Sequence, residues 1–320
     1  MNALSVSDLS VEYRLRSGVV RALDRVSFEA RAGEILGVVG ESGSGKTTAA
    51  FAVLGLLDPA ARVTSGRADF EGRDLLGMRP AERDGLRGRD LAIVFQNPRA
   101  ALNPIRSIGA QIGDVIARHA PAPADAIRAK ALAALRAVRI ADPERRMAAF
   151  PYELSGGLCQ RAGIAIALAC APRLLIADEP TTGLDATTQA VIMDLIRDMA
   201  SERGIAVILI THDLALAWRY CDRVAVMHAG QVVETAPREA LFAHARHPYA
   251  DKLLRSAPAN ADNLDALEPI EGDPPNLMRA DLPPCRFSER CSRRQAICDV
   301  GPLVLQPVGP EHAVACRRPL

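Results

Sequence analysis

Four short runs of consecutive apolar residues lie in the first two-thirds of the chain: EILGVVG (34–40), LAIVF (91–95), RLLIAD (173–178) and AVILIT (206–211). Unbroken apolar runs of this length are typical of strands that are buried on both faces, as in a parallel sheet covered by helices. Helical patterns separate the runs, and such alternation is characteristic of α/β proteins. The pattern therefore predicts a mainly parallel sheet with helices on both of its faces.

Between the second and third runs the period becomes helical. DAIRAKALAALRAVRIAD (125–142) places Ile127, Leu132, Leu135 and Val138 at roughly helical spacing. APAPAD (120–125) precedes it and has the composition of a loop. We therefore expect a helical subdomain inserted at about residues 97–165.

The character of the chain changes again after about residue 240. GDPPN, LPPC and GPLVLQPVGP are rich in proline and glycine and show little helical or strand period. The sequence thus predicts one large domain over residues 1–240 and a small irregular C-terminal extension over 241–320.

Composition and charge narrow the functional classes to which the chain could belong. The chain has 320 residues, 49% apolar content and a formal charge of +1, which gives no electrostatic case for a nucleic-acid-binding protein. The N-terminus lacks the pattern of a secretory signal, and the longest apolar run, AGIAIALACA (162–171), is too short to cross a bilayer. If the protein works at a membrane, we expect other chains to supply the spans, and its seven cysteines are expected to be thiols or ligands rather than disulfides.

GESGSGKT (40–47) follows one predicted strand and precedes an apolar helix, which is the context that a phosphate-binding loop requires. Gly43 and Gly45 allow backbone N–H groups to turn inward toward an anion, and the start of the helix adds partial positive charge. Lys46 is expected to reach the β- and γ-phosphates and Thr47 to ligate Mg²⁺. The alternative is a glycine-rich turn before a capped helix.

LLIADEP (174–180) is an apolar strand that ends in two acids. Together with a phosphate loop, Asp178 is expected to hold Mg²⁺ and Glu179 to orient and deprotonate the attacking water. Alone, a carboxylate at a strand end is usually a solvated turn residue.

The segment YELSGGLCQRAGIAIAL (152–168) carries LSGG shortly before LLIADEP, and TTGLD and ILITHDL follow. This ordered set, over about residues 4–235, resembles the ATP-binding cassette (ABC) ATPases. The resemblance implies a P-loop NTPase core and a head-to-tail dimer, in which Ser155, Gly156 and Gly157 face the phosphate loop of a second nucleotide-binding domain. LSGG by itself is only a serine N-cap followed by glycines.

The other positions of the family pattern are carried over one by one. Gln96 matches the glutamine that senses Mg²⁺ and water, Asp185 the acid that communicates across the dimer, His212 the switch histidine, and Tyr13 the aromatic that stacks on adenine. The resemblance thus implies catalytic roles for Glu179, His212 and Gln96, and Mg²⁺ ligation by Thr47, Gln96 and Asp178. The implied ATP site comprises Tyr13, Gly40, Glu41, Ser42, Gly43, Ser44, Gly45, Lys46, Thr47, Thr48, Gln96, Asp178, Glu179 and His212.

Several segments resemble more narrowly the ATP-binding subunits of dipeptide and oligopeptide importers: FQNPRAALNPIRSIGAQI (95–112), TTGLDATTQA (181–190), HPYADKLL (247–254) and GDPPN (272–276). This resemblance implies a peripheral subunit at the cytoplasmic face of the inner membrane that hydrolyses ATP to energise uptake of peptides or a related small solute. Its partners would be a second ATPase subunit, two permeases that contact the LNP segment, and an extracytoplasmic solute-binding protein, with no nucleic acid. The alternative is a soluble ABC ATPase acting on nucleic acid or ribosomes, which the neutral charge and the absence of a second cassette disfavour.

The C-terminal extension contains four cysteines, Cys285, Cys291, Cys298 and Cys316. Four thiolates suit either tetrahedral Zn²⁺ or a [4Fe–4S] cluster, and the spacing does not choose between them. The resemblance to importer subunits favours iron. The alternative is a set of free thiols, which is the expectation for Cys159, Cys170 and Cys221.

Overall fold

The computed structural model describes residues 2–256 and 268–320. The described chain forms two compact units. The first unit comprises Ala32–Glu34 and Met78–Leu209, and the second comprises Asn2–Arg31, Ile35–Gly77 and Ile210–Leu320.

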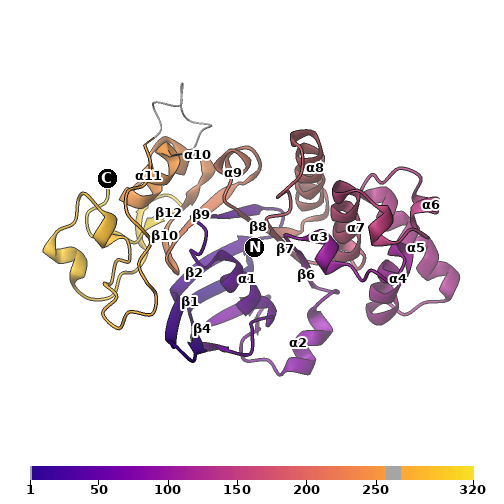
Figure 1. The fold of residues 1–320 in the computed structure, drawn as a ribbon, viewed down its shortest axis with the longest axis horizontal. Coiled ribbons are helices and arrows are strands. Elements are labelled where there is room, and N and C mark those ends of the chain that lie inside the picture. The colour runs from indigo at the N-terminus through magenta and orange to yellow at the C-terminus, as the bar shows by residue number, and fades with distance from the viewer. Residues whose placement is uncertain (1, 257–267) are drawn as a thin grey trace. The chain divides into compact units, whose positions relative to one another are not determined.

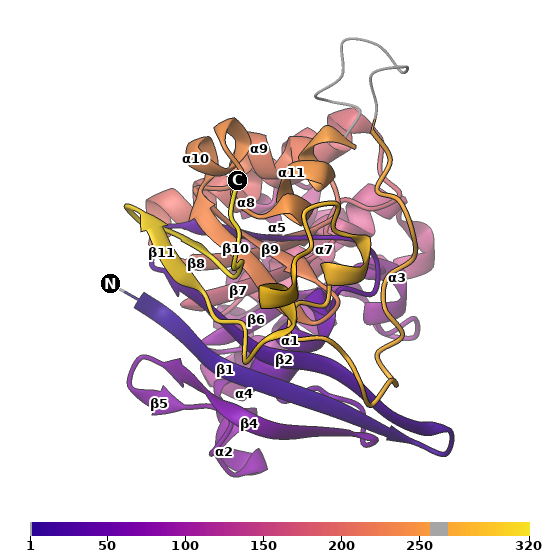
Figure 2. The ribbon, with the colours of Figure 1, turned by 90° about the vertical axis from the view of Figure 1, so that its left-hand side faces the viewer.

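The second unit contains an antiparallel sheet at its N-terminal end. Its strands run in the order β2-β1-β4-β5 and are β1 (Asn2–Leu15), β2 (Gly18–Arg31), β4 (Ala61–Phe70) and β5 (Arg73–Asp74). Figure 2 shows β1 lying between β2 and β4. Leu4, Val6, Leu9 and Val11 of β1 are buried, whereas Ser7 and Asp8 are exposed. Polar residues interrupt the apolar ones along β1, so this sheet gave no unbroken apolar run in the sequence.

A second set of strands in the same unit runs in the order β11-β12-β10-β9-β3. These are β3 (Ile35–Val39), β9 (Arg223–His228), β10 (Gln231–Pro237), β11 (Gln306–Gly309) and β12 (His312–Val314). Strand β3 is buried throughout, as its apolar run predicts, and pairs in parallel with β9. The two short strands β11 and β12 lie in the C-terminal extension and were not predicted, and β12 pairs antiparallel with β10.

The helices of the second unit are α1 (Lys46–Leu54), α9 (Leu214–Tyr220), α10 (Arg238–Ala243) and α11 (Pro248–Arg255), with short 3₁₀ turns at Ser288–Arg290 and Ala296–Asp299. Gly45 and Gly55 flank α1 in left-handed conformations that glycine adopts without strain.

The first unit combines strands with most of the helices. Its strands run in the order β8-β7-β6 and are β6 (Leu91–Val94), β7 (Leu174–Asp178) and β8 (Ala206–Thr211), whose last two residues belong to the second unit. Strands β6 and β7 pair in parallel, and β7 and β8 are buried at every residue. All four strands expected from apolar runs are therefore present, and their parallel pairing is confirmed for β3 with β9 and for β6 with β7.

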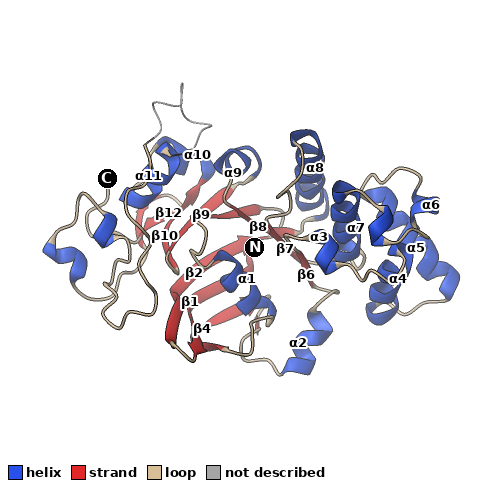
Figure 3. Ribbon diagram, in the orientation of Figure 1, coloured by secondary structure: helices blue, strands red, loops and turns tan. Residues whose placement is uncertain are grey.

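The helices of the first unit are α2 (Pro80–Leu86), α3 (Pro98–Ala101), α4 (Ile108–His119), α5 (Ala124–Ala137), α6 (Pro143–Arg146), α7 (Gly156–Leu168) and α8 (Ala186–Arg203), with a 3₁₀ turn at Pro151–Glu153. Figures 1 and 3 show α4, α5, α6 and α7 grouped together. Helix α5 lies where the helical period indicated, although Ala131 and Leu135 are its buried residues while Leu132 is only half-buried. Within the described parts of the chain, no helix has the length and apolar character needed to span a membrane.

Candidate functional site

The glycine-rich loop connects β3 to α1 in the second unit. Gly43 has a φ of 77° and Gly45 a φ of 100°, values that a side chain with a Cβ rarely adopts. A Cβ on Gly40 would lie 2.1 Å from the carbonyl oxygen of Met227, so the start of the loop packs directly on β9. The loop thus has the tight, glycine-dependent path that an anion-binding nest requires.

Lys46, the first residue of α1, is only 7% exposed. Its Nζ donates hydrogen bonds to the carbonyl oxygens of Gly40 at 2.8 Å and Glu41 at 2.9 Å, and to the Ser44 hydroxyl at 3.3 Å. The ammonium group therefore lies inside the curve of the loop. Thr47 is exposed and Thr48 half-buried at the start of the same helix.

The two acids of the second motif lie at the end of β7 in the first unit. Asp178 is the last residue of the strand and is 5% exposed. Glu179 follows it with a φ of 44°, a costly conformation for a residue with a side chain and one that clusters at functional sites. Its Oε2 accepts hydrogen bonds from Gln96 Nε2 at 2.7 Å and from Thr182 Oγ1 at 3.0 Å. The structure thus brings together Gln96 and Glu179, which lie far apart in the sequence.

The LSGG segment starts α7. Ser155 is the N-cap, and its hydroxyl accepts from the backbone N–H of Leu158 at 3.4 Å, as a serine N-cap does. A Cβ on Gly157 would lie 2.7 Å from Thr188 Cγ2, so glycine allows α7 to approach α8 closely here. Asp185 caps α8, and its carboxylate accepts from the backbone N–H and the hydroxyl of Thr188, which lowers its pKa.

Tyr13 and His212 lie in the second unit with the glycine-rich loop. Tyr13 is half-buried on β1, opposite Val20 of β2 and Ala61 of β4. His212 is exposed directly after β8. Both residues therefore occupy strand or strand-end positions, as the motifs indicate.

The four cysteines of the extension lie around one pocket. All four are half-buried, and burial together with the neighbouring thiols of Cys316, Cys291 and Cys298 raises the pKa of Cys285 to about 12. Burial also raises the pKa of Cys316. Three arginines line the same pocket, namely Arg293, Arg317 and Arg318. The residues that the structure describes contain no group of three or more His, Cys, Asp or Glu side chains arranged to hold a metal ion.

His247 also lines this pocket and is 1% exposed. Its Nδ1 accepts from the backbone N–H of Tyr249 at 3.0 Å, so in the neutral ring the proton lies on Nε2. Burial lowers the pKa of His247 to about 3, which keeps the ring neutral. Nε2 is a buried donor with no hydrogen-bond partner among the described residues. A buried donor of this kind needs an acceptor in or beside the pocket.

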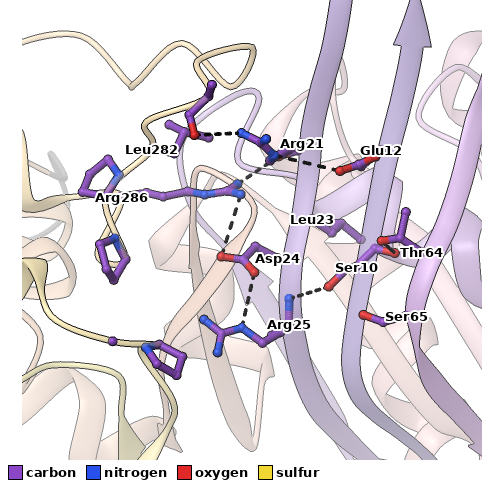
Figure 4. A pocket seen from close by; sticks show the side chains of 15 residues that line it. Ser10, Glu12, Arg21, Leu23, Asp24, Arg25, Thr64, Ser65, Leu282 and Arg286 are labelled. Carbon is purple, nitrogen blue, oxygen red and sulfur yellow. Dashed lines mark hydrogen bonds and ion pairs between the residues drawn. The ribbon is translucent and has the colours of Figure 1, made fainter.

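Arg286, next to Cys285, fixes the extension against the antiparallel sheet. Its guanidinium is 3% exposed, donates to the carbonyl oxygens of Arg21 and Ala229, and lies 3.8 Å from Asp24. Figure 4 shows this side chain reaching from the extension into a pocket of about 460 Å³ that β1, β2 and β4 also line. The extension is therefore a docked part of the second unit rather than a loose tail.

A contact between the extension and the glycine-rich loop was not predicted, although one of its two residues, Glu41, belongs to the predicted ATP site. Arg290 donates two hydrogen bonds to the carboxylate of Glu41, the second residue of the loop, at 2.9 and 3.1 Å. The two residues are 249 positions apart, and neither belongs to a periodic pattern that could have paired them.

Comparison with known proteins agrees with the arrangement of these motifs. Residues 23–182 match the family model described as "ABC transporter". The chain belongs to the ABC transporter family.

The C-terminal part of this ABC protein, residues 233–298, matches a second family model, described as "Oligopeptide/dipeptide transporter, C-terminal region". Over 317 residues the chain is 44% identical to a probable peptide ABC transporter ATP-binding protein, y4tR, of Sinorhizobium fredii, covering 98% of this chain and 94% of the relative. It is 40% identical to the dipeptide transport ATP-binding protein DppD of Escherichia coli, covering 100% of this chain and 98% of the relative.

Among solved structures, the ATP-binding cassette MJ0796, a dimer bound to ADP and Pi, matches with a TM-score of 0.67 and 26% identity over 73% of this chain and 98% of that one. The predicted ABC-type α/β core is thereby confirmed, and the chain is an ABC-type ATPase.

Proposed function

We propose that this ABC protein hydrolyses ATP to energise the uptake of dipeptides, oligopeptides or a related small solute. The observation that carries the proposal is the full-length similarity to peptide-transport ATP-binding proteins, which extends through the C-terminal region that those proteins share. The alternative of a soluble ATPase acting on nucleic acid receives no support from these relatives.

We assign the chemistry to the residues that the motifs identified. Glu179 acts as the general base, because Gln96 and Thr182 orient its carboxylate and its backbone has the strained φ that clusters at functional sites. Lys46 and the loop N–H groups bind the phosphates, His212 contacts the γ-phosphate, and Tyr13 stacks on adenine. Thr47, Gln96 and Asp178 would hold Mg²⁺, which when bound would neutralise charge on the phosphates.

The proposal includes a head-to-tail pair of ATPase subunits. In that pair Ser155, Gly156 and Gly157 bind the γ-phosphate held by the partner subunit's loop, since the start of α7 presents backbone N–H groups and partial positive charge. Asp185 at the start of α8 communicates between the two sites.

We propose that the LNP segment contacts the permeases at the cytoplasmic face of the membrane. Ile105, directly after this segment, is 82% exposed, so its side chain is accessible to a permease. Two hydrogen bonds at Asn103 hold the segment. The Asn103 side chain accepts from the backbone N–H of Ile105 at 3.1 Å, and the Gln111 side chain donates to the backbone carbonyl oxygen of Asn103.

The test is purification of the full chain with its native partners. We expect two polytopic permeases and a second ATPase subunit to co-purify, and ATP hydrolysis by the complex to rise when a solute-binding protein loaded with peptide is added. Recovery with ribosomes or nucleic acid, or hydrolysis indifferent to loaded binding protein, would refute the transport proposal.

We also propose that the four-cysteine pocket holds a [4Fe–4S] cluster rather than Zn²⁺. The support for the proposal is that all four cysteines line one pocket and that four thiolates suit such a cluster, while the resemblance to importer subunits favours iron over Zn²⁺. The three arginines and the unpartnered His247 Nε2–H would compensate its negative charge. When bound, such a cluster would serve as a staple for the proline-rich extension.

Anaerobic purification with iron, sulfide and zinc analysis decides this point. We expect about four irons and four sulfides per chain, lost in Cys316→Ser. A folded, colourless chain without either metal would refute the cluster, and one zinc per chain would favour the ion.

A further inference from the structure

Glu41 lies inside the glycine-rich loop, yet its side chain faces the C-terminal extension. Its carboxylate accepts the paired hydrogen bonds from Arg290, and His228 Nδ1 lies 3.5 Å from Oε2. The backbone N–H of Glu41 donates to the Tyr249 hydroxyl at 3.0 Å. Side chain and backbone of this one loop residue are thus held by groups from β9, α11 and the extension.

The same residue is joined to the phosphate-binding groups. The carbonyl oxygen of Glu41 accepts from Lys46 Nζ at 2.9 Å and from the backbone N–H of Ser44 at 3.2 Å. The carbonyl oxygen of Ser44 in turn accepts from Gly230 N at 2.8 Å. A shift of the Glu41 backbone would therefore move the oxygen that fixes the lysine ammonium.

Arg290 is itself held firmly. Its side chain is 5% exposed, its Nε donates to the carbonyl oxygen of Glu271 at 3.0 Å, and its guanidinium lies 5.8 Å from the ring centre of Phe287. A planar guanidinium that makes two parallel bonds fixes the orientation of a carboxylate as well as its position. The neighbouring residue, Cys291, lines the four-cysteine pocket.

The surroundings of Glu41 favour its ionised form and hence a lasting ion pair with Arg290. His228 and Arg290 together lower the pKa of Glu41 to about 2 against the opposing effect of burial. The carboxylate is therefore charged at neutral pH, where its contact with Arg290 is an ion pair.

We propose that Arg290 is a positioning residue of the ATP site: through Glu41 it holds the phosphate loop in its binding conformation and so couples the C-terminal extension to nucleotide affinity. ATP then binds more tightly when the extension is docked on the loop. The inference rests on the proposed function only in that the loop is taken to bind ATP.

The experiment measures the dissociation constant of a fluorescent ATP analogue with the full chain. We expect Arg290→Met to weaken binding about 5- to 50-fold, in the range of typical coupling free energies between sites. Arg290→Lys keeps the positive charge but lacks the planar pair of N–H donors. Its dissociation constant should therefore fall between those of Arg290→Met and wild type. In the assembled ATPase, KM for ATP should rise in Arg290→Met while kcat changes less than about twofold, because the loss concerns binding rather than the reacting groups.

The matched control is Arg294→Met, which removes an arginine of the same extension whose partner, Asp299, is also in the extension. We expect it to bind like wild type. If Arg290→Met does not fold, Glu41→Gln removes the same ion pair from the loop side and should also weaken binding. The double variant should bind no more weakly than Arg290→Met alone, because both changes break one contact.

Wild-type affinity in folded Arg290→Met or Glu41→Gln would overturn the inference, as would fully additive losses in the double variant. A wild-type chain that does not bind the analogue would instead refute the proposed ATP site.

Discussion

Two glutamates, one in each unit, differ in how the fold holds them. Glu41 in the glycine-rich loop pairs with the guanidinium of Arg290 and lies beside His228, and its pKa is about 2. Glu179 at the end of β7 accepts from an amide and a hydroxyl, and its own backbone is strained. A fixed cation keeps the first carboxylate ionised. The amide of Gln96 and the hydroxyl of Thr182 orient the second.

The difference indicates a structural role for the Glu41 carboxylate and a chemical role for that of Glu179. An acid locked to an arginine can fix a loop but makes a poor general base, because protonation would break the ion pair. An acid that an amide and a hydroxyl orient, on a backbone in a costly conformation, has the strain that clusters at reactive sites. Exchanging each acid for its amide should therefore affect different quantities.

The largest effect is expected for Glu179→Gln. Loss of a general base typically lowers the rate about 10²- to 10⁴-fold, and the amide keeps the shape of the side chain, so ATP binding should persist. Steady-state hydrolysis by the assembled complex and equilibrium binding of nucleotide measure the two quantities. Glu202→Gln, an exposed exchange at the end of α8, is the control. Normal turnover in Glu179→Gln would contradict the role of base.

Glu41 should instead appear in the pH dependence of stability. Because its pKa in the folded chain, about 2, lies below the ordinary value of 4.5, the ionised group stabilises the fold fully above about pH 4.5. That contribution is lost as the pH falls from about 4.5 toward 2. We expect wild type to exceed Glu41→Gln by about 1–3 kcal/mol in free energy of unfolding at pH 6, with the gap closing below pH 4.5.

Denaturant unfolding of both proteins at a series of pH values from 7 to 3 measures this gap. Other acids titrate in the same range, but they do so in both proteins and cancel in the difference. A gap that stays constant across the series would show that the ion pair with Arg290 does not lower the pKa of Glu41.

The two acids also differ in how much of their surroundings could be predicted from the sequence. The contacts of Lys46 with its own loop follow from a motif of eight neighbouring residues, and β3, β6, β7 and β8 follow from unbroken apolar runs. These signals are local, because a buried parallel strand and a phosphate loop each constrain consecutive residues. The position of Glu179 was predicted in the same way, but its strained φ was not.

The partners of Glu41 gave no such signal. Arg290 lies in a segment with little periodicity of apolar residues, and Tyr249 lies in a short helix that depends on tertiary packing. The same is true of β11 and β12, whose pairing depends on a strand far away in the sequence. Ion pairs and strand pairings between distant polar segments depend on the final fold, so no spacing rule reveals them.

A smaller effect is expected for Gln96→Leu. The change removes the 2.7 Å donor to Glu179 and the proposed Mg²⁺ ligand, and we expect a loss of about tenfold or more in kcat, comparable with loss of one hydrogen bond to a charged group. Gln189→Leu is the matched control, because its Nε2 donates to Thr181 Oγ1 and not to an acid. Equal losses in the two variants would mean that Gln96 acts only through packing.

The smallest effect is expected for a change that alters the orientation of Glu179 without removing a proposed Mg²⁺ ligand. Thr182→Val removes the 3.0 Å hydroxyl donor to Glu179 Oε2 while keeping the volume of the side chain, and Thr182 is not a proposed Mg²⁺ ligand. We expect kcat to fall about three- to tenfold with KM for ATP unchanged, because a base that loses one of its orienting donors is less often aligned. Thr182→Ser should restore the rate, since it returns the hydroxyl. A rise in KM in place of the fall in kcat would mean that Thr182 acts on binding, and the orientation of Glu179 would then depend on Gln96 and the strained backbone.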